Sequence, residues 1–365
     1  MAAGGFDVVI GNPPYVEISP KKVNYIINQV SHTECGNLYA PITSRSLTLL
    51  GFKGAFSFIV PGASVNTPRM SQLLDLLQSQ VSYLQLTQYD ERPSKLFDGV
   101  DQQLCIQVGL RNGEEALVVS PMRHWYTPSG LGEERGSYLF GTNESIKVSS
   151  KARVASVIPK IGYPIEIGLL EKLSALNVMD IFVQENSQSS SIYYRNAGGR
   201  YWRLVKSFPS YFMSSSGASS STTEHEIHVL SKYSAIASTL YSSSLFYWFW
   251  RVASNCRHLT KREFENFQVP KVLLVDPCLS TLKRLRDEYE ASLKINAVRK
   301  TVTSRASGVI EQDEYRVAQS KSIIDQIDKV IAAALGITEE ELDYIINYDI
   351  KYRMGLNGAE VDEDD

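Results

Sequence analysis

The chain has 365 residues, of which 43% are hydrophobic, and a formal net charge of −3. Its size and composition predict a globular protein with two packed cores. No apolar run reaches the roughly 18 residues of a membrane span, and no signal peptide is recognisable, so the composition predicts a cytoplasmic protein without membrane contact. The four cysteines show neither CxxC nor Cys/His ligand spacing, which indicates a reducing compartment and predicts no metal site.

Residues 1–120 are predicted to form an α/β unit. Helices are expected over residues 38–50 and from Thr67-Pro68 onward, where an N-cap precedes a proline at the first helical position. Four short apolar runs have the length of buried strands, at residues 6–10, 55–60, 81–86 and 104–110. The last run is joined to residues 116–120 by Arg111-Asn112-Gly113-Glu114, which predicts a hairpin at one edge of the sheet. This pattern corresponds to most of one half of a doubly wound, Rossmann-like domain.

The rest of the chain is predicted to form an α+β segment, a helical segment and a tail. Residues 121–272 contain short apolar pieces, many aromatics and the polar stretch 214–223, which is expected to be a mobile loop. Residues 273–355 have helical periodicity; Gly336 is predicted to end one helix, and Thr338 with Glu341 to form a capping box for the next. Residues 356–365 are predicted to be an acidic, disordered tail.

The net charge hides a basic region in the middle of the chain. Between Ser191 and Val272 there are ten Lys/Arg and four Asp/Glu, a local charge of +6, whereas five acids follow Asn357. This distribution predicts salt-sensitive binding of double-stranded DNA by the middle region.

The segment after the first predicted strand, Asn12-Pro13-Pro14-Tyr15, cannot continue that strand. In an open α/β sheet, ligands bind where strands end at their carboxyl edge. Two prolines make the turn stiff and remove two N–H donors, so the Asn12 side-chain oxygen and the Pro13 carbonyl can both accept hydrogen bonds from one NH₂ group. Such contacts favour a pyramidal nitrogen with a usable lone pair. Tyr15 can stack on the ring that carries the amine, and its hydroxyl has no predicted partner.

At this point the sequence resembles a known family, the γ-class adenine-N6 DNA methyltransferases of Type IIG restriction-modification and BREX phage-defence systems. The resemblance rests on Asn12-Pro13-Pro14-Tyr15, on Asn37-Leu38-Tyr39 leading to the segment 54–61, and on Leu96-Phe97-Asp98-Gly99-Val100. It extends loosely to Arg200-Tyr201-Trp202-Arg203, to Cys256-Arg257-His258-Leu259-Thr260 and to residues 267–270, which look like parts of the family's target-recognition domain.

The resemblance implies a role for each part of the chain. Asn12, Pro13, Pro14 and Tyr15 would be the catalytic turn, which holds a flipped adenine beside S-adenosylmethionine. Phe97 would stack on the other face of the base, although a Phe before a strand is also typical of a core. Residues 121–272 would be the target-recognition domain, with DNA contacts from Arg195, Arg200, Arg203, Lys206, Arg257 and Lys261, for which solvated surface is the alternative.

One part of the family pattern is missing. In this family the glycine-rich turn and the acidic residue that bind the cofactor precede Asn-Pro-Pro-Tyr, and here eleven residues precede Asn12. The chain therefore resembles the C-terminal part of a methyltransferase, in which Asn12 provides only part of a cofactor site and S-adenosylmethionine is not expected to bind to this chain alone. A separate chain is expected to supply the N-terminal half, unless the gene is truncated.

Three functions remain open from the sequence. The leading hypothesis is an S-adenosylmethionine-dependent adenine-N6 DNA methyltransferase of a restriction-modification or phage-defence system. The alternative is a non-catalytic DNA-specificity module, a relic that keeps the base pocket. A third possibility is a protein-interaction fragment, because Pro-Pro-x-Tyr also resembles a ligand of WW domains. His225 and His228 have metal-like neighbours, but no metal is predicted.

Overall fold

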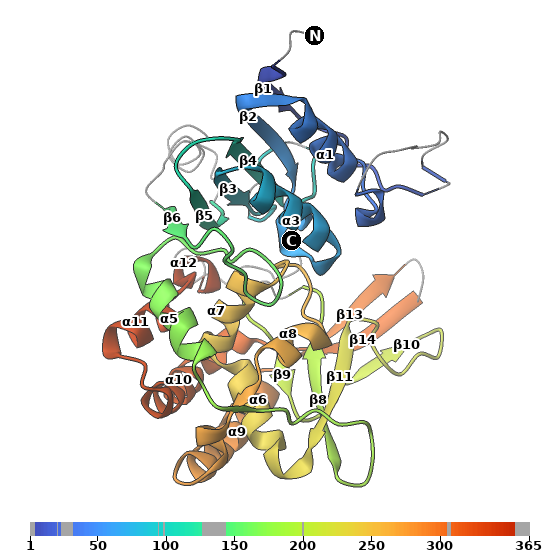
Figure 1. Ribbon diagram of the computed structural model, residues 1–365. Helices are drawn as coiled ribbons and strands as arrows, with labels where there is room; N and C mark the ends of the chain where they lie inside the picture. The colour runs from blue at the N-terminus through green and yellow to red at the C-terminus, as the bar shows by residue number, and fades with distance from the viewer. Residues whose placement is uncertain are drawn as a thin grey trace. The chain divides into compact units, whose positions relative to one another are not determined.

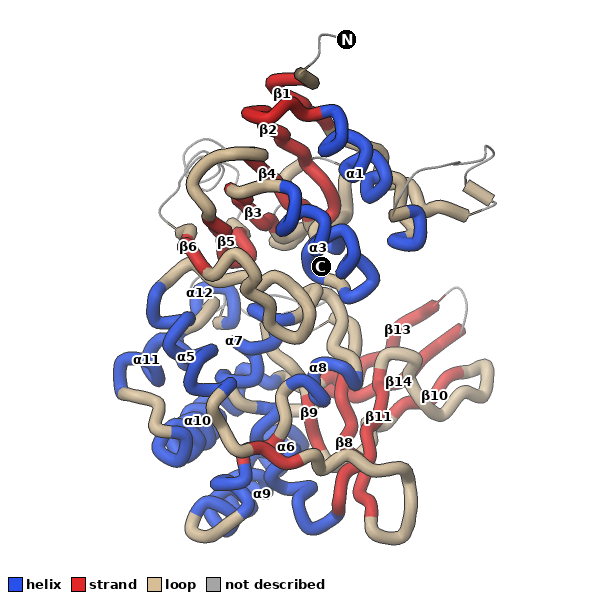
Figure 2. Tube along the Cα trace, in the orientation of Figure 1, coloured by secondary structure: helices blue, strands red, loops and turns tan. Residues whose placement is uncertain are grey.

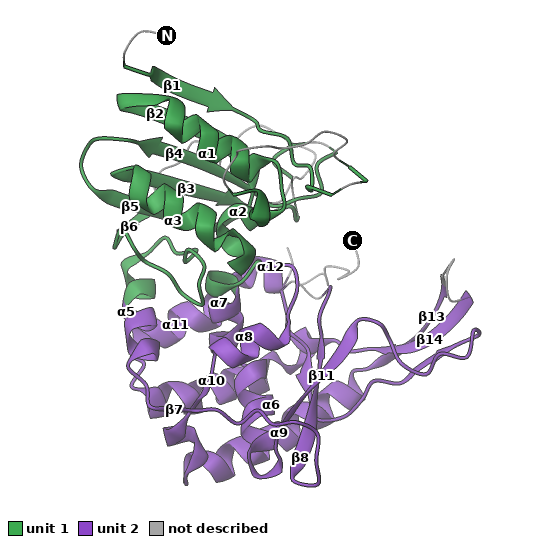
Figure 3. Ribbon diagram, turned by 45° about the vertical axis from the view of Figure 1, so that its right-hand side comes forward, with its two compact units in different colours: residues 1–167, 251–255 green, residues 168–250, 256–365 purple. Residues whose placement is uncertain are grey.

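The computed structural model describes residues 4–19, 21–22, 32–93, 95–97, 99–125, 144–198, 201–304 and 308–354. The chain divides into two compact units (Figure 3): unit 1 is Met1–Ile167 with Arg251–Asn255, and unit 2 is Gly168–Trp250 with Cys256–Asp365. This division differs from the expected segments, since part of the segment 121–272 belongs to unit 1. The reason is that strands at residues 116–123 and 146–148 continue the sheet of unit 1.

Unit 1 is built on one six-stranded mixed sheet in the order β1-β2-β4-β3-β5-β6. Its strands are β1 (Phe6–Gly11), β2 (Leu50–Pro61), β3 (Tyr83–Tyr89), β4 (Leu104–Leu110), β5 (Ala116–Arg123) and β6 (Ile146–Val148). The helices α1 (Tyr39–Leu49), α2 (Ala63–Asn66) and α3 (Ser71–Gln80) lie on one face (Figure 1). The predicted α/β character of this part is confirmed, and the parallel pairs β1/β2 and β3/β5 are consistent with a Rossmann-like sheet.

The ends of five strands lie next to one another along one side of this sheet. We call this side the shared edge, to distinguish it from the outer edge along β1. β1 runs parallel to β2, β3 runs parallel to β5, and β4 is antiparallel to both of its neighbours. The carboxyl ends of β1, β2, β3 and β5 therefore meet the start of β4 at the same edge. A backbone hydrogen bond from Gly62 to the Gln103 carbonyl (2.7 Å) joins two of them. Asn12 follows β1 at this edge.

The predicted hairpin between β4 and β5 is wrong. β4 lies between β2 and β3, and β5 pairs with β3 on its other side. The link after Leu110 crosses the start of β3, where Ser82 donates to the Leu110 carbonyl and Ala116 donates to the Ser82 carbonyl. Both edges of β4 are occupied by strands that precede it in the sequence, so β5 adds beyond β3.

The expectation that the first strand is buried is also wrong. β1 is an edge strand, and Phe6, Val8 and Ile10 are 50%, 62% and 76% exposed. Residues 6–10 are apolar except for Asp7, which is typical of a covered strand, but within the described residues only β2 pairs with β1. An apolar strand with one open edge is a preformed template for another strand.

Unit 2 combines three small sheets with a group of helices, and Figure 2 shows its larger sheets to one side of the helices. The sheets have the strand orders β11-β8-β9, β10-β14-β13 and β12-β7. The strands are β7 (Val178–Met179), β8 (Ser189–Arg195), β9 (Val205–Lys206), β10 (Phe212–Ser214), β11 (Glu224–Leu230), β12 (Val269–Pro270), β13 (Val298–Ser304) and β14 (Gly308–Glu314). The helices α6 (Ser234–Ser242), α8 (Lys261–Asn266), α9 (Cys278–Ile295), α10 (Lys321–Leu335), α11 (Glu339–Asn347) and α12 (Ile350–Arg353) belong wholly to it. Two further helices, α5 (Pro164–Ser174) and α7 (Ser244–Ala253), pass from one unit to the other along the chain.

Several local predictions in unit 2 are confirmed. Gly336 ends α10 in the left-handed conformation (φ 66°), which glycine adopts without steric cost, and Thr338 with Glu341 forms the capping box of α11. The stretch 214–223 is irregular after β10, as expected, and is hydrogen-bonded to itself through Ser214 and Ala218. The hairpin β13–β14 was missed, because its polar sequence has no apolar alternation. No helix in the described ranges is long and apolar enough to cross a membrane.

Candidate functional site

The Asn-Pro-Pro-Tyr turn leaves β1 at the shared edge of the unit 1 sheet. Asn12 and Pro14 are exposed, whereas Pro13 is buried. Pro13 therefore anchors the turn, and the Asn12 carboxamide is open to solvent. It makes no hydrogen bond with the described residues, so both its oxygen and its NH₂ group can bind a ligand.

Tyr15 is fixed at both ends of its ring. Its hydroxyl donates a hydrogen bond to the Ile59 carbonyl of β2 (3.1 Å), a partner that the sequence analysis missed. The ring packs against a buried cluster, consisting of Tyr89, Leu96, Leu104 and Trp125. Burial raises the pKa of Tyr15 to about 12, so the hydroxyl stays protonated and can donate at neutral pH. The ring orientation is therefore set before any ligand binds.

Phe97 lies beside the same cluster but does not join it. Its neighbour Leu96 is 6% exposed and is a member of the cluster, whereas Phe97 itself is 41% exposed. The structure does not support the alternative that Phe97 is a core residue. Its exposed aromatic ring is available to contact a planar ligand, and such a role remains a proposal.

Asp90 joins the two ends of the loop that carries Phe97. One carboxylate oxygen, Asp90 Oδ1, accepts hydrogen bonds from the Glu91 backbone N–H (2.9 Å) and from Gln103 Nε2 (3.2 Å). Asp90 follows β3 and Gln103 precedes β4, so this contact joins the two ends of the intervening loop. Both side chains are buried. We call Asp90 and Gln103, with Arg251, the Asp90 clasp.

Arg251 neutralises Asp90 in the interior of unit 1. Its Nη1 lies 3.0 Å from Asp90 Oδ2, and both side chains are nearly inaccessible, at 2% and 3% exposure. His124, at the end of β5, contacts Arg251 Nη2 at 3.2 Å. Residues 245–251, a run of six apolar or aromatic residues followed by Arg251, are all buried. Arg251 is the one charged residue in that apolar run. Its presence there was the one sequence signal for a buried acidic partner.

Two of the predicted DNA contacts lie in the interior of unit 2. Lys206 is fully buried, forms an ion pair with Glu224 (2.8 Å) and donates to the Phe208 carbonyl (2.7 Å). Arg203 is 5% exposed, and its guanidinium carbon lies 3.8 Å from the centre of the Trp250 ring. Their burial does not favour the predicted DNA contacts, because their charge is used in packing the unit.

The other predicted DNA contacts differ in exposure. Arg257 and Lys261 are exposed, and Lys261 forms only a surface pair with Glu265 (3.2 Å). Arg195 is half-buried at the end of β8. Arg200 lies outside the described residues. Arg257, four residues before α8, and Lys261, the first residue of α8, thus remain as candidates for phosphate contacts.

The two histidines with metal-like neighbours have other partners. His225 Nε2 lies 2.8 Å from Asn196 Nδ2, and His228 Nδ1 lies 3.3 Å from Ser191 Oγ. Within the described ranges, no group of three or more His, Cys, Asp or Glu side chains is arranged to hold a metal.

The described part of unit 1 does not fit S-adenosylmethionine by itself. A cofactor of that size is normally enclosed over most of its surface. Asn12 is exposed, and the outer edge of β1 is open, so neither would enclose a bound cofactor. Asn12 can contact one side of a cofactor, but further residues would have to enclose it.

Comparison with known proteins connects this turn to a family. Residues 1–96 match the family model described as Eco57I restriction-modification methylase. The N-terminal segment resembles a restriction-modification methylase. This confirms the resemblance that was predicted from Asn-Pro-Pro-Tyr. The methylase-like segment (residues 1–96) contains the turn, Tyr15 and the whole of β1 to β3. No curated protein matches the chain.

Solved structures give weaker similarities. The Type IIL restriction-modification enzyme MmeI in complex with DNA is 10% identical, with 96% of this chain and 55% of that chain covered and a TM-score of 0.41. The Type ISP enzyme LlaBIII bound to DNA is 13% identical (54% and 15% covered, TM-score 0.31), and the DrdV–DNA complex is 11% identical (57% and 22% covered, TM-score 0.31). Such scores do not establish a shared fold. The chain spans 15% to 55% of the length of these three proteins.

Replacing Tyr15 by Phe is expected to lower the stability of unit 1. The change leaves the Ile59 carbonyl without its donor in a partly buried place, which costs about 1 kcal/mol. Urea denaturation of Tyr15→Phe would measure this loss. The matched control is Tyr163→Phe, whose hydroxyl contacts Glu144 at the surface and whose removal should change the free energy of unfolding by less than about 0.5 kcal/mol. Equal effects of the two changes would contradict the anchoring role of the Tyr15 hydroxyl.

Proposed function

We propose that the chain is the base-binding and DNA-recognition part of an adenine-N6 DNA methyltransferase in a restriction-modification or phage-defence system. The observation that carries the proposal is the Asn12–Tyr15 turn in the methylase-like segment. There an accessible carboxamide stands beside an aromatic ring whose orientation is already fixed. Phe97, which directly follows the cluster member Leu96 and has an exposed ring, would be the second aromatic group of the site.

The proposed chemistry follows from the groups of the turn. The N6 amine of adenine is a poor nucleophile because its lone pair is delocalised into the ring. The Asn12 side-chain oxygen and the Pro13 carbonyl would each accept a hydrogen bond from one of the two N–H groups of this amine. These hydrogen bonds favour a pyramidal nitrogen. Because the turn is stiff, these acceptors need little rearrangement when the reaction begins.

The base would be held between two aromatic rings. An adenine must leave the helix to reach the turn, and it loses stacking energy when it does so. Tyr15 on one face and Phe97 on the other would replace that stacking, which is worth about 1–3 kcal/mol per base. The Asp90 clasp would keep the loop of Phe97 in place before DNA binds.

S-adenosylmethionine would supply the methyl group in the complete enzyme. Since the described residues do not enclose it, we propose that a cofactor-binding segment joins unit 1 at the open edge of β1, either in the same chain or in a separate one. The exposed side chains of Phe6, Val8 and Ile10 favour this, because an apolar edge strand gains both hydrogen bonds and burial when another strand pairs with it.

A non-catalytic DNA-specificity module is the alternative. The exposed Arg257 and Lys261 favour DNA binding under both proposals, whereas the accessible Asn12 carboxamide favours the enzyme. The test is methylation of adenine in DNA by the full chain, supplied with a cofactor-binding methylase segment and S-adenosylmethionine, with N6-methyladenine measured by mass spectrometry. DNA binding without any methylation would favour the module over the enzyme.

Lys261→Ala is expected to weaken DNA binding evenly across sequences. The slope of log K against log salt concentration is negative. Removal of one phosphate contact lowers its magnitude by about one, because fewer counterions are released. The measurement is fluorescence anisotropy with duplex DNA over a range of salt concentrations. Lys283→Ala, at another exposed lysine on α9, is the control and should leave the slope unchanged. The same slope for Lys261→Ala and wild type would remove Lys261 from the DNA-binding surface.

A further inference from the structure

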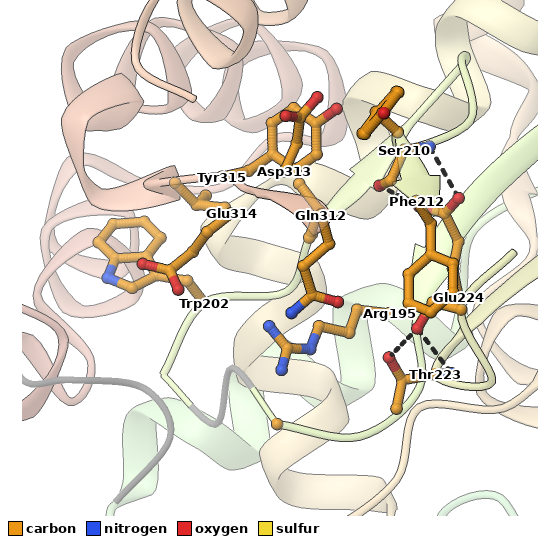
Figure 4. A pocket seen from close by; sticks show the side chains of 15 residues that line it. Arg195, Trp202, Ser210, Phe212, Thr223, Glu224, Gln312, Asp313, Glu314 and Tyr315 are labelled. Atoms are coloured by element: carbon orange, nitrogen blue, oxygen red, sulfur yellow. Dashed lines mark hydrogen bonds between the residues drawn. The ribbon is translucent and has the colours of Figure 1, made fainter. Parts of the chain in front are cut away.

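The acidic side chains that line the pocket of unit 2 have cationic partners. This pocket lies between the two three-stranded sheets (Figure 4). Asp313 forms an ion pair with Arg299 at 2.6 Å. Its neighbour Glu314 pairs with Lys300 at the same distance. These carboxylates are already neutralised, so they do not make the pocket a site for a cation.

Arg69 of unit 1 has no such partner. It belongs to the short helical turn Pro68–Met70 directly before α3, and its side chain is exposed. Its guanidinium makes no hydrogen bond or ion pair with the described residues, whereas Arg153 of the same unit pairs with Asp75 at 2.7 Å. All the N–H donors of Arg69 are therefore available to a ligand.

The guanidinium of Arg69 packs directly against Gly36. A Cβ added at Gly36 would overlap Nη2 and Cζ of Arg69 and would lie 2.8 Å from its Nε. Gly36 also has a φ of 72°, in the left-handed region that glycine adopts without steric cost. Any other residue at this position would displace the guanidinium, so the backbone at Gly36 sets where Arg69 can lie.

Gly36 is itself joined to the segment that follows the Asn-Pro-Pro-Tyr turn. The Ile18 N–H donates to the Gly36 carbonyl (3.0 Å), and the Leu38 N–H donates to the Val16 carbonyl (2.9 Å). Three residues of chain span at most about 10 Å, so Ile18 lies within that distance of Tyr15. Arg69 is therefore an unpaired cation beside the proposed base site, and all these residues belong to unit 1.

We infer that Arg69 binds a backbone phosphate next to the extruded adenine, on the strand that supplies that base. A nucleotide is extruded by rotation about its backbone, so the neighbouring phosphates follow the base toward the turn. A guanidinium offers paired donors that match two phosphate oxygens, and the seat on Gly36 reduces the ordering that binding requires. The inference rests on the proposed function, because it needs an adenine at the turn. It differs from the contacts proposed for Arg257 and Lys261, which do not require an extruded base.

The test is fluorescence anisotropy of the full chain with duplex DNA that carries one unpaired adenine, and with a fully paired duplex of the same sequence. In a further set, single phosphates beside the unpaired adenine are replaced one at a time by neutral methylphosphonates. Wild type should prefer the unpaired adenine and should lose about tenfold in affinity at one methylphosphonate position. Arg69→Ala should lose about tenfold on the unmodified duplex and nothing further at that position, because both changes remove the same contact.

Two further variants serve as controls. Arg69→Lys keeps the charge but not the planar pair of donors, so it should lose less affinity than Arg69→Ala and keep the salt dependence of wild type. Arg45→Ala removes another exposed arginine of unit 1, on α1, which donates to Thr48 (3.3 Å). It should keep both the preference for the unpaired adenine and the methylphosphonate effect. The melting temperature of Arg69→Ala should equal that of wild type, because the side chain is exposed.

The outcomes separate this inference from the proposed function. If wild type prefers the unpaired adenine but Arg69→Ala still shows every methylphosphonate loss that wild type shows, Arg69 binds none of these phosphates and the inference is overturned, while the proposed function stands. The inference also fails if no methylphosphonate position weakens wild type. A wild-type chain that binds the unpaired adenine no more tightly than the paired duplex would contradict the base-binding role in the proposed function itself.

Discussion

Asn12→Ala is expected to slow methyl transfer about 100-fold or more in the enzyme completed by a cofactor-binding segment, with DNA affinity within about twofold of wild type. Removal of one preorganised hydrogen-bonding group from a reacting centre typically has an effect of this size. The affinity is preserved because phosphate contacts, to which Asn12 does not contribute, dominate it. Asn12 is exposed and makes no hydrogen bond with the described residues, so the change should leave the fold intact.

The measurement is single-turnover methyl transfer on saturating DNA. Asn112→Ala is the matched control, because Asn112 is an exposed asparagine in the link after β4, away from the turn. It should react at the wild-type rate. If Asn12→Ala also reacts at that rate, Asn-Pro-Pro-Tyr is only a strand-ending turn, and the specificity module becomes the better account of the chain.

Arg251→Ala is expected to destabilise unit 1 by about 3–5 kcal/mol, the largest loss of stability predicted for a single substitution here. The change leaves Asp90 as a buried charge without its ion-pair partner, 3.0 Å from where the guanidinium was. Gln103 and the Glu91 backbone N–H still donate to Asp90, but these neutral hydrogen bonds do not compensate for the lost cation. The free energy of unfolding from urea denaturation measures the effect.

A double substitution distinguishes the buried pair from general loss of packing. Asp90→Leu with Arg251→Met removes both charges and keeps apolar volume, so it should cost less than the sum of the two single changes. Amide hydrogen exchange of residues 91–92 and 99–102 should rise in Arg251→Ala, because the two ends of the loop are no longer held together. Additive single effects with unchanged exchange would show that the clasp does not hold the loop of Phe97.

The sequence alone determined the features that depend on near neighbours. The turn after the first strand is predictable because two prolines cannot continue a strand, and Gly336, Thr338 and Glu341 mark helix ends through contacts within four residues. The core role of residues 245–251 follows from composition. The resemblance to a methylase rests on the same kind of short, contiguous pattern, which explains why a family model covers residues 1–96.

Only the tertiary structure decided which distant segments meet. The insertion of β4 between β2 and β3 excludes the expected hairpin, and the position of β1 at the sheet edge exposes an apolar run that looks buried in the sequence. Likewise, Lys206 and Arg203 add to the local positive charge of the sequence, yet they are buried beside Glu224 and Trp250, residues 18 and 47 positions away. The Ile59 partner of Tyr15 and the Asp90 clasp depend on the same long-range packing. Burial and partners are properties of the folded chain, because they are set by residues that the sequence keeps far apart.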